Sequence, residues 1–163
     1  MRYPAEVGTI LGVRIVEGWP NADEVGLFAW LVGAVKHDPT LVEWGQVVLI
    51  HNTDRALIGT AGFKGAPDET GTVEFGYGVV PTYQLQGYAT EAVAALLAWA
   101  FKHPAVRRVF ADCLPENTAS ARVLEKLGLR QLPATDALLC WELQKRDWLA
   151  QQRTAAARRG EHG

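Results

Sequence analysis

A glycine-containing segment between two apolar stretches has the residue types needed to bind an anion. It follows the pattern Q-x-x-G-x-A over residues 84–89 and leads into a stretch with helical periodicity. Gly87 allows the backbone to approach a ligand closely and can take a positive φ. The amides of residues 86–90 would then open a helix without intrahelical partners, an arrangement that favours phosphate. An ordinary strand-to-helix turn is the alternative interpretation of these residues.

The elements that must position this segment begin with an antiparallel meander. Apolar runs separated by turn-forming residues predict strands, and helical spacing after Asn21 or Asp23 predicts a helix. Pro81 is expected to end the last strand of the meander, because proline has no amide proton to donate. The predicted elements of this half are a strand at 10–16, a helix at 22–36 and strands at 47–51, 56–63 and 73–80.

The second half continues with the helix predicted over residues 88–103, whose apolar residues form one stripe. Asn117 is expected to cap a later helix that ends at Gly128. Further strands are predicted at 107–113, 129–132 and 138–143. This order indicates an α/β (α+β) fold with a mixed, mostly antiparallel central sheet and helices on both faces. Residues 1–143 are expected to form a single domain, followed over 144–163 by a basic tail that is partly helical or disordered.

Composition limits the class of protein. The 163 residues have 48% apolar and 21% charged residues, as expected of a globular domain with a core. A net charge of −2 argues against a general nucleic-acid binder. Cys113 and Cys140 lie in separate apolar runs without metal-ligand spacing, and two buried thiols are expected. With neither a membrane-spanning run nor a convincing signal peptide, we expect a cytoplasmic protein.

Three segments together resemble the GNAT superfamily of N-acetyltransferases. They are the Q-x-x-G-x-A loop, the strand sequence E-F-G-Y that begins at Glu74, and the sequence N-T-A-S that begins at Asn117 and runs into V-L-E-K-L-G-L. The resemblance is to the branch that includes ribosomal-protein N-terminal (alanine) acetyltransferases, and it is tight from Thr72 to Arg130. All three segments occur in the right order on the expected elements, which makes the resemblance specific.

The resemblance implies that acetyl-coenzyme A is the co-substrate, held without a metal ion. Loop amides would bind the pyrophosphate, and an amide at the strand end, first of all that of Val79, would stabilise the oxyanion. Val79 and Val80 can be core residues at the same time, because the implied role uses only their backbone. Asn117 can likewise cap a helix as well as contact the cofactor. The family often has Arg or Lys in place of Gln86, so amides and helix dipole carry more weight here. The implied cofactor-binding residues are Val79, Val80, Gln84, Leu85, Gln86, Gly87, Tyr88, Ala89, Thr90, Asn117 and Ser120.

Glu74 and Ser120 are the candidates for proton transfer. Glu74 lies on the predicted strand five residues before Val79, and a strand carboxylate near the acetyl group could take the amine proton directly or through water. The resemblance places Ser120 near the coenzyme A sulfur. An exposed strand residue and a solvent-facing helical serine are the alternatives. Many members use a late tyrosine as the acid, whereas this chain has none after Tyr88, which favours Ser120, a water or no dedicated acid.

Together these features predict an N-acetyltransferase acting by direct attack in a ternary complex. Its acceptor is a primary amine, either a protein N-terminus or a small amine such as a polyamine, amino acid or aminoglycoside. The missing late tyrosine motivates an alternative, a catalytically silent coenzyme A-binding sensor or interaction module. We expect no nucleic acid or membrane partner and a monomer or homodimer. His51 is a further candidate for the base, and Tyr77 and Tyr83 are further candidates for the acid, with a core position as the alternative for Tyr77.

Overall fold

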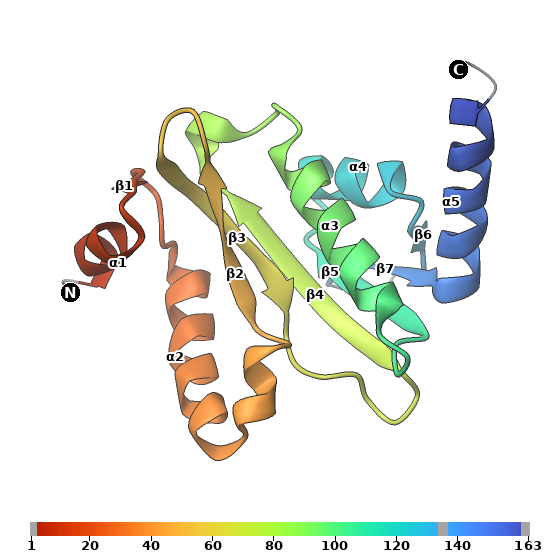
Figure 1. Ribbon diagram of the computed structural model, residues 1–163, viewed down its shortest axis with the longest axis horizontal. Coiled ribbons are helices and arrows are strands. Elements are labelled where there is room, and N and C mark those ends of the chain that lie inside the picture. The colour runs from red at the N-terminus through yellow and green to blue at the C-terminus, as the bar shows by residue number, and fades with distance from the viewer. Residues whose placement is uncertain (1–2, 134–136, 161–163) are drawn as a thin grey trace. The chain divides into compact units, whose positions relative to one another are not determined.

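The computed structural model describes residues 3–133 and 137–160 (Figure 1). Four of its six strand pairs are antiparallel, namely β2–β3, β3–β4, β5–β7 and β6–β7. The pairs follow the order β1-β3-β4-β5-β7-β6, with β2 also paired to β3. This mixed, mostly antiparallel arrangement with α-helices confirms the predicted fold class. None of the described helices is long and apolar enough to cross a membrane.

The contacts divide the chain into two compact units. Unit 1 contains the described residues up to Ala66 together with Phe75–Leu96, and unit 2 contains Pro67–Glu74 and the described residues from Leu97 onward. Strand β4 (Thr72–Val79) contributes to both units. Its first three residues pair with β5, and those from Phe75 onward pair with β3. The predicted single domain over 1–143 with its tail stays a prediction.

Unit 1 consists of a small sheet and the helices that surround it. Strand β3 is its centre, pairing in parallel with β1 and antiparallel with β2 and β4. The elements are α1 (Tyr3–Leu11), β1 (Arg14–Ile15), α2 (Ala22–His37), η1 (Pro39–Val42), β2 (Gln46–His51), β3 (Ala56–Phe63), the later part of β4, η2 (Pro81–Tyr83) and the first part of α3 (Tyr88–Lys102).

The strand predicted over residues 10–16 is mostly wrong. A helix occupies Tyr3–Leu11, and within residues 10–16 only Arg14 and Ile15 form a strand. Gly12 ends the helix in the left-handed region at φ 63°, where glycine has no Cβ penalty. Gly8 has no room for a side chain, since a Cβ would lie 2.9 Å from the Val13 carbonyl oxygen. Gly8 and Gly12 therefore allow the chain that follows this short helix to pack against the helix.

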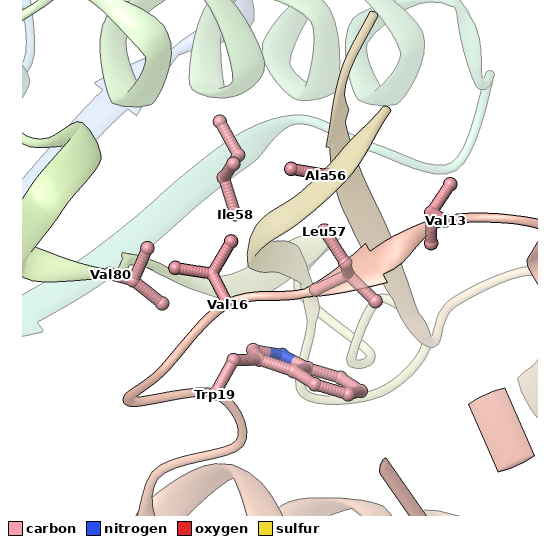
Figure 2. Packing of buried hydrophobic residues seen from close by; sticks show 7 residues of the cluster. All are labelled: Val13, Val16, Trp19, Ala56, Leu57, Ile58 and Val80. Atoms are coloured by element: carbon pink, nitrogen blue, oxygen red, sulfur yellow. The ribbon is translucent and has the colours of Figure 1, made fainter. Parts of the chain in front are cut away.

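The core of unit 1 gathers where β1, β3 and the end of β4 meet. Figure 2 shows its seven buried side chains, which come from the chain around β1, from the start of β3 and from the residue after β4. Burying one such Val or Leu side chain contributes about 1.5–3 kcal/mol. The cluster therefore fixes the end of β4, from which the loop continues. Its members are Val13, Val16, Trp19, Ala56, Leu57, Ile58 and Val80.

Unit 2 is built on β5, which pairs in parallel with the start of β4 and antiparallel with β7. Asn117 caps α4, and Gly128 follows that helix at φ 82°, so both predicted ends of the helix are confirmed. The elements are the start of β4, the end of α3, β5 (Arg108–Cys113), α4 (Thr118–Lys126), β6 (Arg130–Gln131), β7 (Leu139–Gln144) and α5 (Lys145–Gly160).

One buried acid in unit 2 has two cationic partners. Glu142 is 4% exposed, and its carboxylate pairs with Arg108 at 3.1 Å and with Arg130. Burial opposes ionisation, but hydrogen bonds from the two arginines outweigh it, so the pKa of the Glu142 carboxyl lies below its usual range. The charge is therefore compensated where β5, β6 and β7 pair.

Candidate functional site

The loop between β4 and α3 turns twice through the left-handed region. Leu85 has φ 61° and is 91% exposed, and Gly87 has φ 90°. The positive φ predicted for Gly87 is confirmed, while that of Leu85 is uncommon for a residue with a side chain. A Cβ added at Gly87 would meet no described atom within 4 Å. The glycine therefore faces open space, and its backbone can be approached closely.

Helix α3 opens directly from this loop without a side-chain cap. Its first intrahelical bond runs from the Glu91 amide to the Gly87 carbonyl at 3.0 Å. The amides of Tyr88, Ala89 and Thr90 precede that bond, so they have no partner within the helix. Glycine at the cap position has no oxygen to offer them. The helix N-terminus thus presents amide donors and the positive end of its dipole, as an anion requires.

The strand end supplies a further amide. Val80 donates to the Ile58 carbonyl at 2.8 Å, which makes that cross-strand pair a hydrogen-bonded one. The neighbouring pair in the register, Gly59 with Val79, is therefore of the non-hydrogen-bonded type. The amide and carbonyl of Val79 point away from β3, whereas the amide of Val80 is used by the sheet. Of the two predicted valines, Val79 is thus the one oriented to donate to a ligand.

The two loop glutamines bind the loop itself. Gln84 Nε2 donates to the Val79 carbonyl at 2.8 Å, and Gln86 Nε2 donates to the Thr82 carbonyl at 3.3 Å. Gln84 thereby ties the loop to the end of β4. These two side chains therefore hold the shape of the loop.

Two tyrosines bracket the loop and are anchored to the β2–β3 turn. Tyr83 donates from its hydroxyl to Asp54 Oδ2 at 2.6 Å, and the Tyr88 hydroxyl lies 2.9 Å from His51 Nε2. His51 Nδ1 lies 3.2 Å from the Asp54 carboxylate, and Arg14 donates to Tyr83 at 3.2 Å. Asp54 and Arg14 were not identified from the sequence, because Tyr83, which bonds both, lies 29 and 69 residues away from them. The turn between β2 and β3 brings Asp54 to the loop, and the parallel pairing of β1 with β3 brings Arg14 there.

The Asp54 hydrogen bond raises the pKa of the Tyr83 phenol, with burial adding to the effect and Arg14 opposing it. Tyr83 therefore keeps its proton and remains the donor to Asp54. As a candidate acid it is poorly placed, because its proton is already engaged with a carboxylate.

Unit 2 carries the remaining predicted cofactor-binding residues. Asn117 Oδ1 accepts from the Ser120 amide at 3.0 Å, which confirms the expected helix cap. The Ser120 side chain lies beside Cys113, whose thiol ends β5. Burial raises the pKa of the Cys113 thiol, and interactions with Trp141 and Ser120 act in the opposite direction. Cys113 is a buried thiol, as expected from the sequence, whereas Cys140 is only partly buried.

Glu74 is half-buried on β4, opposite Phe110 of β5. Five residues of strand β4 separate Glu74 from Val79 along the chain. Within unit 1 the structure brings together Val79, Gln84 and the loop that ends at Tyr88, and within unit 2 it brings together Asn117 and Ser120.

Comparison with known proteins identifies the family. A model of the acetyltransferase (GNAT) domain matches residues 5–130. The chain is 29% identical over 118 residues to the uncharacterized N-acetyltransferase YjdG of Bacillus subtilis (strain 168), covering 72% of this chain and 70% of that protein. In three other uncharacterized N-acetyltransferases of Bacillus, the matched regions cover 35%, 47% and 49% of the relative. The chain thus spans about half or less of those three proteins.

Solved structures share the fold. An acetyltransferase (GNAT family) from Bacillus anthracis is 30% identical, with coverage of 62% of this chain and 66% of that chain and a TM-score of 0.54. A ribosomal-protein-S5-alanine acetyltransferase from Vibrio fischeri is 24% identical, with coverage of 72% of this chain and 73% of that chain and a TM-score of 0.58. A variant of the spermidine N-acetyltransferase SpeG from Vibrio cholerae is 15% identical, with coverage of 66% of this chain and 69% of that chain and a TM-score of 0.58. Because the domain model matches well over half of the length of this chain, the chain belongs to the GNAT acetyltransferase family.

Proposed function

We propose that this protein transfers an acetyl group from acetyl-coenzyme A to a primary amine. The observation that carries the proposal is the uncapped N-terminus of α3, which follows a loop with two left-handed residues, Leu85 and Gly87. Membership of the GNAT family supports the same cofactor.

Cofactor binding would rest mainly on backbone groups. The amides of residues 86–90 bind the pyrophosphate, since they lie at a helix N-terminus with its dipole. The Val79 amide donates to the thioester carbonyl oxygen and stabilises the oxyanion that develops there. Asn117 contacts the pantetheine arm in addition to capping α4. In this role Gln84 acts indirectly, by keeping the loop attached to the end of β4.

The chemistry is a single acyl transfer. The amine nitrogen attacks the thioester carbonyl carbon, a C–N bond forms and the C–S bond breaks. The amine proton passes to Glu74 through water, and the coenzyme A thiolate takes a proton from Ser120 or from water. The products are an amide and free coenzyme A, and return of the Glu74 proton through water to Ser120 or to solvent restores the protein.

The acceptor is a protein N-terminus or a small amine. The structural relatives include a ribosomal-protein-S5-alanine acetyltransferase and a spermidine N-acetyltransferase, which are named for acceptors of both kinds. Their identity to this chain is below 25%, so neither relative selects the acceptor.

Calorimetric titration with coenzyme A tests the loop. Gly87→Asp should abolish measurable binding, because the residue has φ 90° and the new carboxylate would face the phosphates. Gln84→Ala should weaken binding roughly 2- to 10-fold through the lost bond to Val79. Gly65→Asp is a matched control, since Gly65 also has a positive φ and open space but follows the far end of β3. Unchanged affinity in Gly87→Asp would rule out the loop as the pyrophosphate site.

A second candidate function is coenzyme A binding without transfer. The observation that favours it is the absence of any tyrosine after Tyr88. A screen of small amines and N-terminal peptides with detection of released thiol separates the two. Binding of acetyl-coenzyme A without thiol release above the hydrolysis rate would support the silent module, and amine-dependent release would support the transferase.

A further inference from the structure

Glu24 of α2 is a buried acid without a cationic partner. It is 8% exposed, and its two carboxylate oxygens accept one bond each, from the Asn21 amide at 2.8 Å and from the Thr60 hydroxyl at 2.5 Å. Across residues 3–133 and 137–160, no Lys, Arg or His forms an ion pair with it. Buried acids are usually paired with a cation, as Glu142 is with two arginines. Glu24 is therefore as buried as the acid of a buried ion pair, but its two hydrogen-bond donors are both neutral.

The carboxylate lies over a place in the sheet where a side chain is missing. Thr60 and Gly78 face each other across β3 and β4, so their side-chain positions are on the same face. Thr60 reaches Glu24 with its hydroxyl. A Cβ at Gly78 would lie 3.7 Å from Glu24 Oε1 and would meet no other described atom within 4 Å. The space beside the carboxylate is thus large enough for a small group.

This open position continues along the strand. Gly76 lies on the same face of β4 because side chains alternate. A Cβ at Gly76 would meet only Lys64 Cε, at 3.8 Å, among the described atoms. Both glycines are partly accessible to solvent. At both positions an added methyl group would therefore meet at most one described side-chain atom.

The space beside Gly78 is next to the proposed position of the thioester carbonyl, which would allow an amine there to attack. Gly78 directly precedes Val79, and adjacent Cα atoms lie about 3.8 Å apart. The Val79 amide is the proposed donor to the thioester oxygen, so an amine beside Gly78 would be close to the carbonyl carbon. Glu74, by contrast, lies five residues before Val79 along the strand.

We infer that Glu24 binds the ammonium group of the acceptor. This inference rests on the proposed transferase function and requires the acceptor to bind as a protonated primary amine. Each carboxylate oxygen accepts one hydrogen bond in the structure and can accept a second, and an ammonium group offers three donors. The amine would replace the missing cationic partner, and loss of its proton to water or Glu74 would precede attack.

Glu24 also completes a capping box with Asn21 at the start of α2. That role accounts for the bond to Asn21, and a glutamine can fill it equally well. It needs neither the charge of Glu24 nor the absence of a side chain at Gly78. Glu24→Gln therefore separates amine binding from helix capping.

Steady-state kinetics of Glu24→Gln test the inference. The KM for the amine should rise roughly 10- to 100-fold, because a charge-assisted bond is lost. Coenzyme A affinity should not change, and kcat should change by less than about threefold. Asp23→Asn is the matched control, since it removes the same charge from an exposed neighbour on the same helix turn. An unchanged amine KM in Glu24→Gln, or a fall in kcat alone, would overturn the inference.

Gly78→Ala provides a test that keeps the carboxylate. The added methyl would be at ordinary van der Waals distance from Glu24, so the protein should fold, but the space for the amine is filled. We expect a higher amine KM with unchanged coenzyme A binding. Gly76→Ala, one position further from Val79 on the same face, is the control and should have a smaller effect.

Failure of the inference can be distinguished from failure of the proposed function. If the wild-type protein turns over amines and Glu24→Gln does so with the same KM, only the inference fails. If the wild type releases no thiol, calorimetry of the coenzyme A complex with spermidine and with an alanine-initiated peptide decides. Binding that is lost in Glu24→Gln would support the amine site, and absence of binding to the wild type would reject it.

Discussion

The phenolic hydroxyl of Tyr88 lies 2.9 Å from Nε2 of His51, so the first residue of α3 is bound to the last residue of β2. With the Tyr83–Asp54 bond, this contact anchors both ends of the β4–α3 loop to one hairpin. The shape of the loop therefore depends on His51 and Asp54, which lie outside the loop on the hairpin.

Removing the Tyr88 anchor should weaken cofactor binding without affecting the chemistry. We expect Tyr88→Phe and His51→Ala each to raise the Kd for coenzyme A roughly 2- to 10-fold, as for the loss of one neutral hydrogen bond. His37→Ala, an exposed histidine on α2, should leave the Kd unchanged. Calorimetry gives the Kd, and equal affinities for wild type and Tyr88→Phe would show that the anchor has no part in binding.

The two glutamates should have different kinetic effects. Glu74→Gln is expected to lower kcat by roughly 100-fold or more if it is the general base, while the amine KM and the coenzyme A affinity are kept. Glu24→Gln should act on the amine KM instead. Thiol-release kinetics measure kcat and the amine KM of both variants. Glu69→Gln, at an exposed position, is the control. A Glu74→Gln enzyme with full kcat would leave water as the proton acceptor.

The Glu142 cluster should make stability depend on acid pH. Since the folded-state pKa is lowered, the cluster stabilises the protein above the ordinary glutamate value of 4.5, and this contribution is lost as the pH falls through the folded-state pKa. Glu142→Gln should cost about 1–3 kcal/mol at neutral pH and progressively less in acid. Urea unfolding at several pH values measures this difference. The exposed Glu125→Gln should show no such convergence, and a pH-independent cost for Glu142→Gln would contradict the assignment.

Two glycines in α2 should be replaceable with a gain in stability. An added Cβ at Gly26 or Gly33 would meet no described atom within 4 Å, and alanine favours a helix interior over glycine by about 0.5–1 kcal/mol. Thermal unfolding should show a higher Tm for each alanine variant. Gly59→Ala is the opposite case, because its Cβ would lie 2.0 Å from the Gly78 carbonyl oxygen and disrupt the β3–β4 pairing. A lower Tm in Gly26→Ala would contradict this prediction.

Local signals were sufficient to predict most elements and part of the candidate site. The hairpin, β4, α3 and α4 follow from alternation, helical periodicity and capping residues, all of which act over a few positions. The cap by Asn117 and the positive φ of Gly87 were predicted for the same reason. In α1 the local prediction was wrong, since the apolar run over residues 10–16 indicated a strand, whereas its first residues belong to a helix.

The remaining parts depend on strand register, which local signals do not encode. Thr60 meets Glu24 over a separation of 36 residues, and His51 meets Tyr88 over 37. Their encounter requires β2, β3 and β4 to pair in one alignment, and a shift by one residue would turn Thr60 to the opposite face. The carboxylate proposed to bind the amine was therefore visible only in the folded chain.

The anchored loop has a consequence for the thermodynamics of binding. Ordering one backbone residue costs about 1–2 kcal/mol of conformational entropy. Because Tyr83 and Tyr88 already hold the loop to the hairpin, that entropy is lost when the protein folds and not when the ligand arrives. A preorganised loop can thus bind an anion through neutral backbone groups, where a flexible one would need the charge of an arginine or lysine.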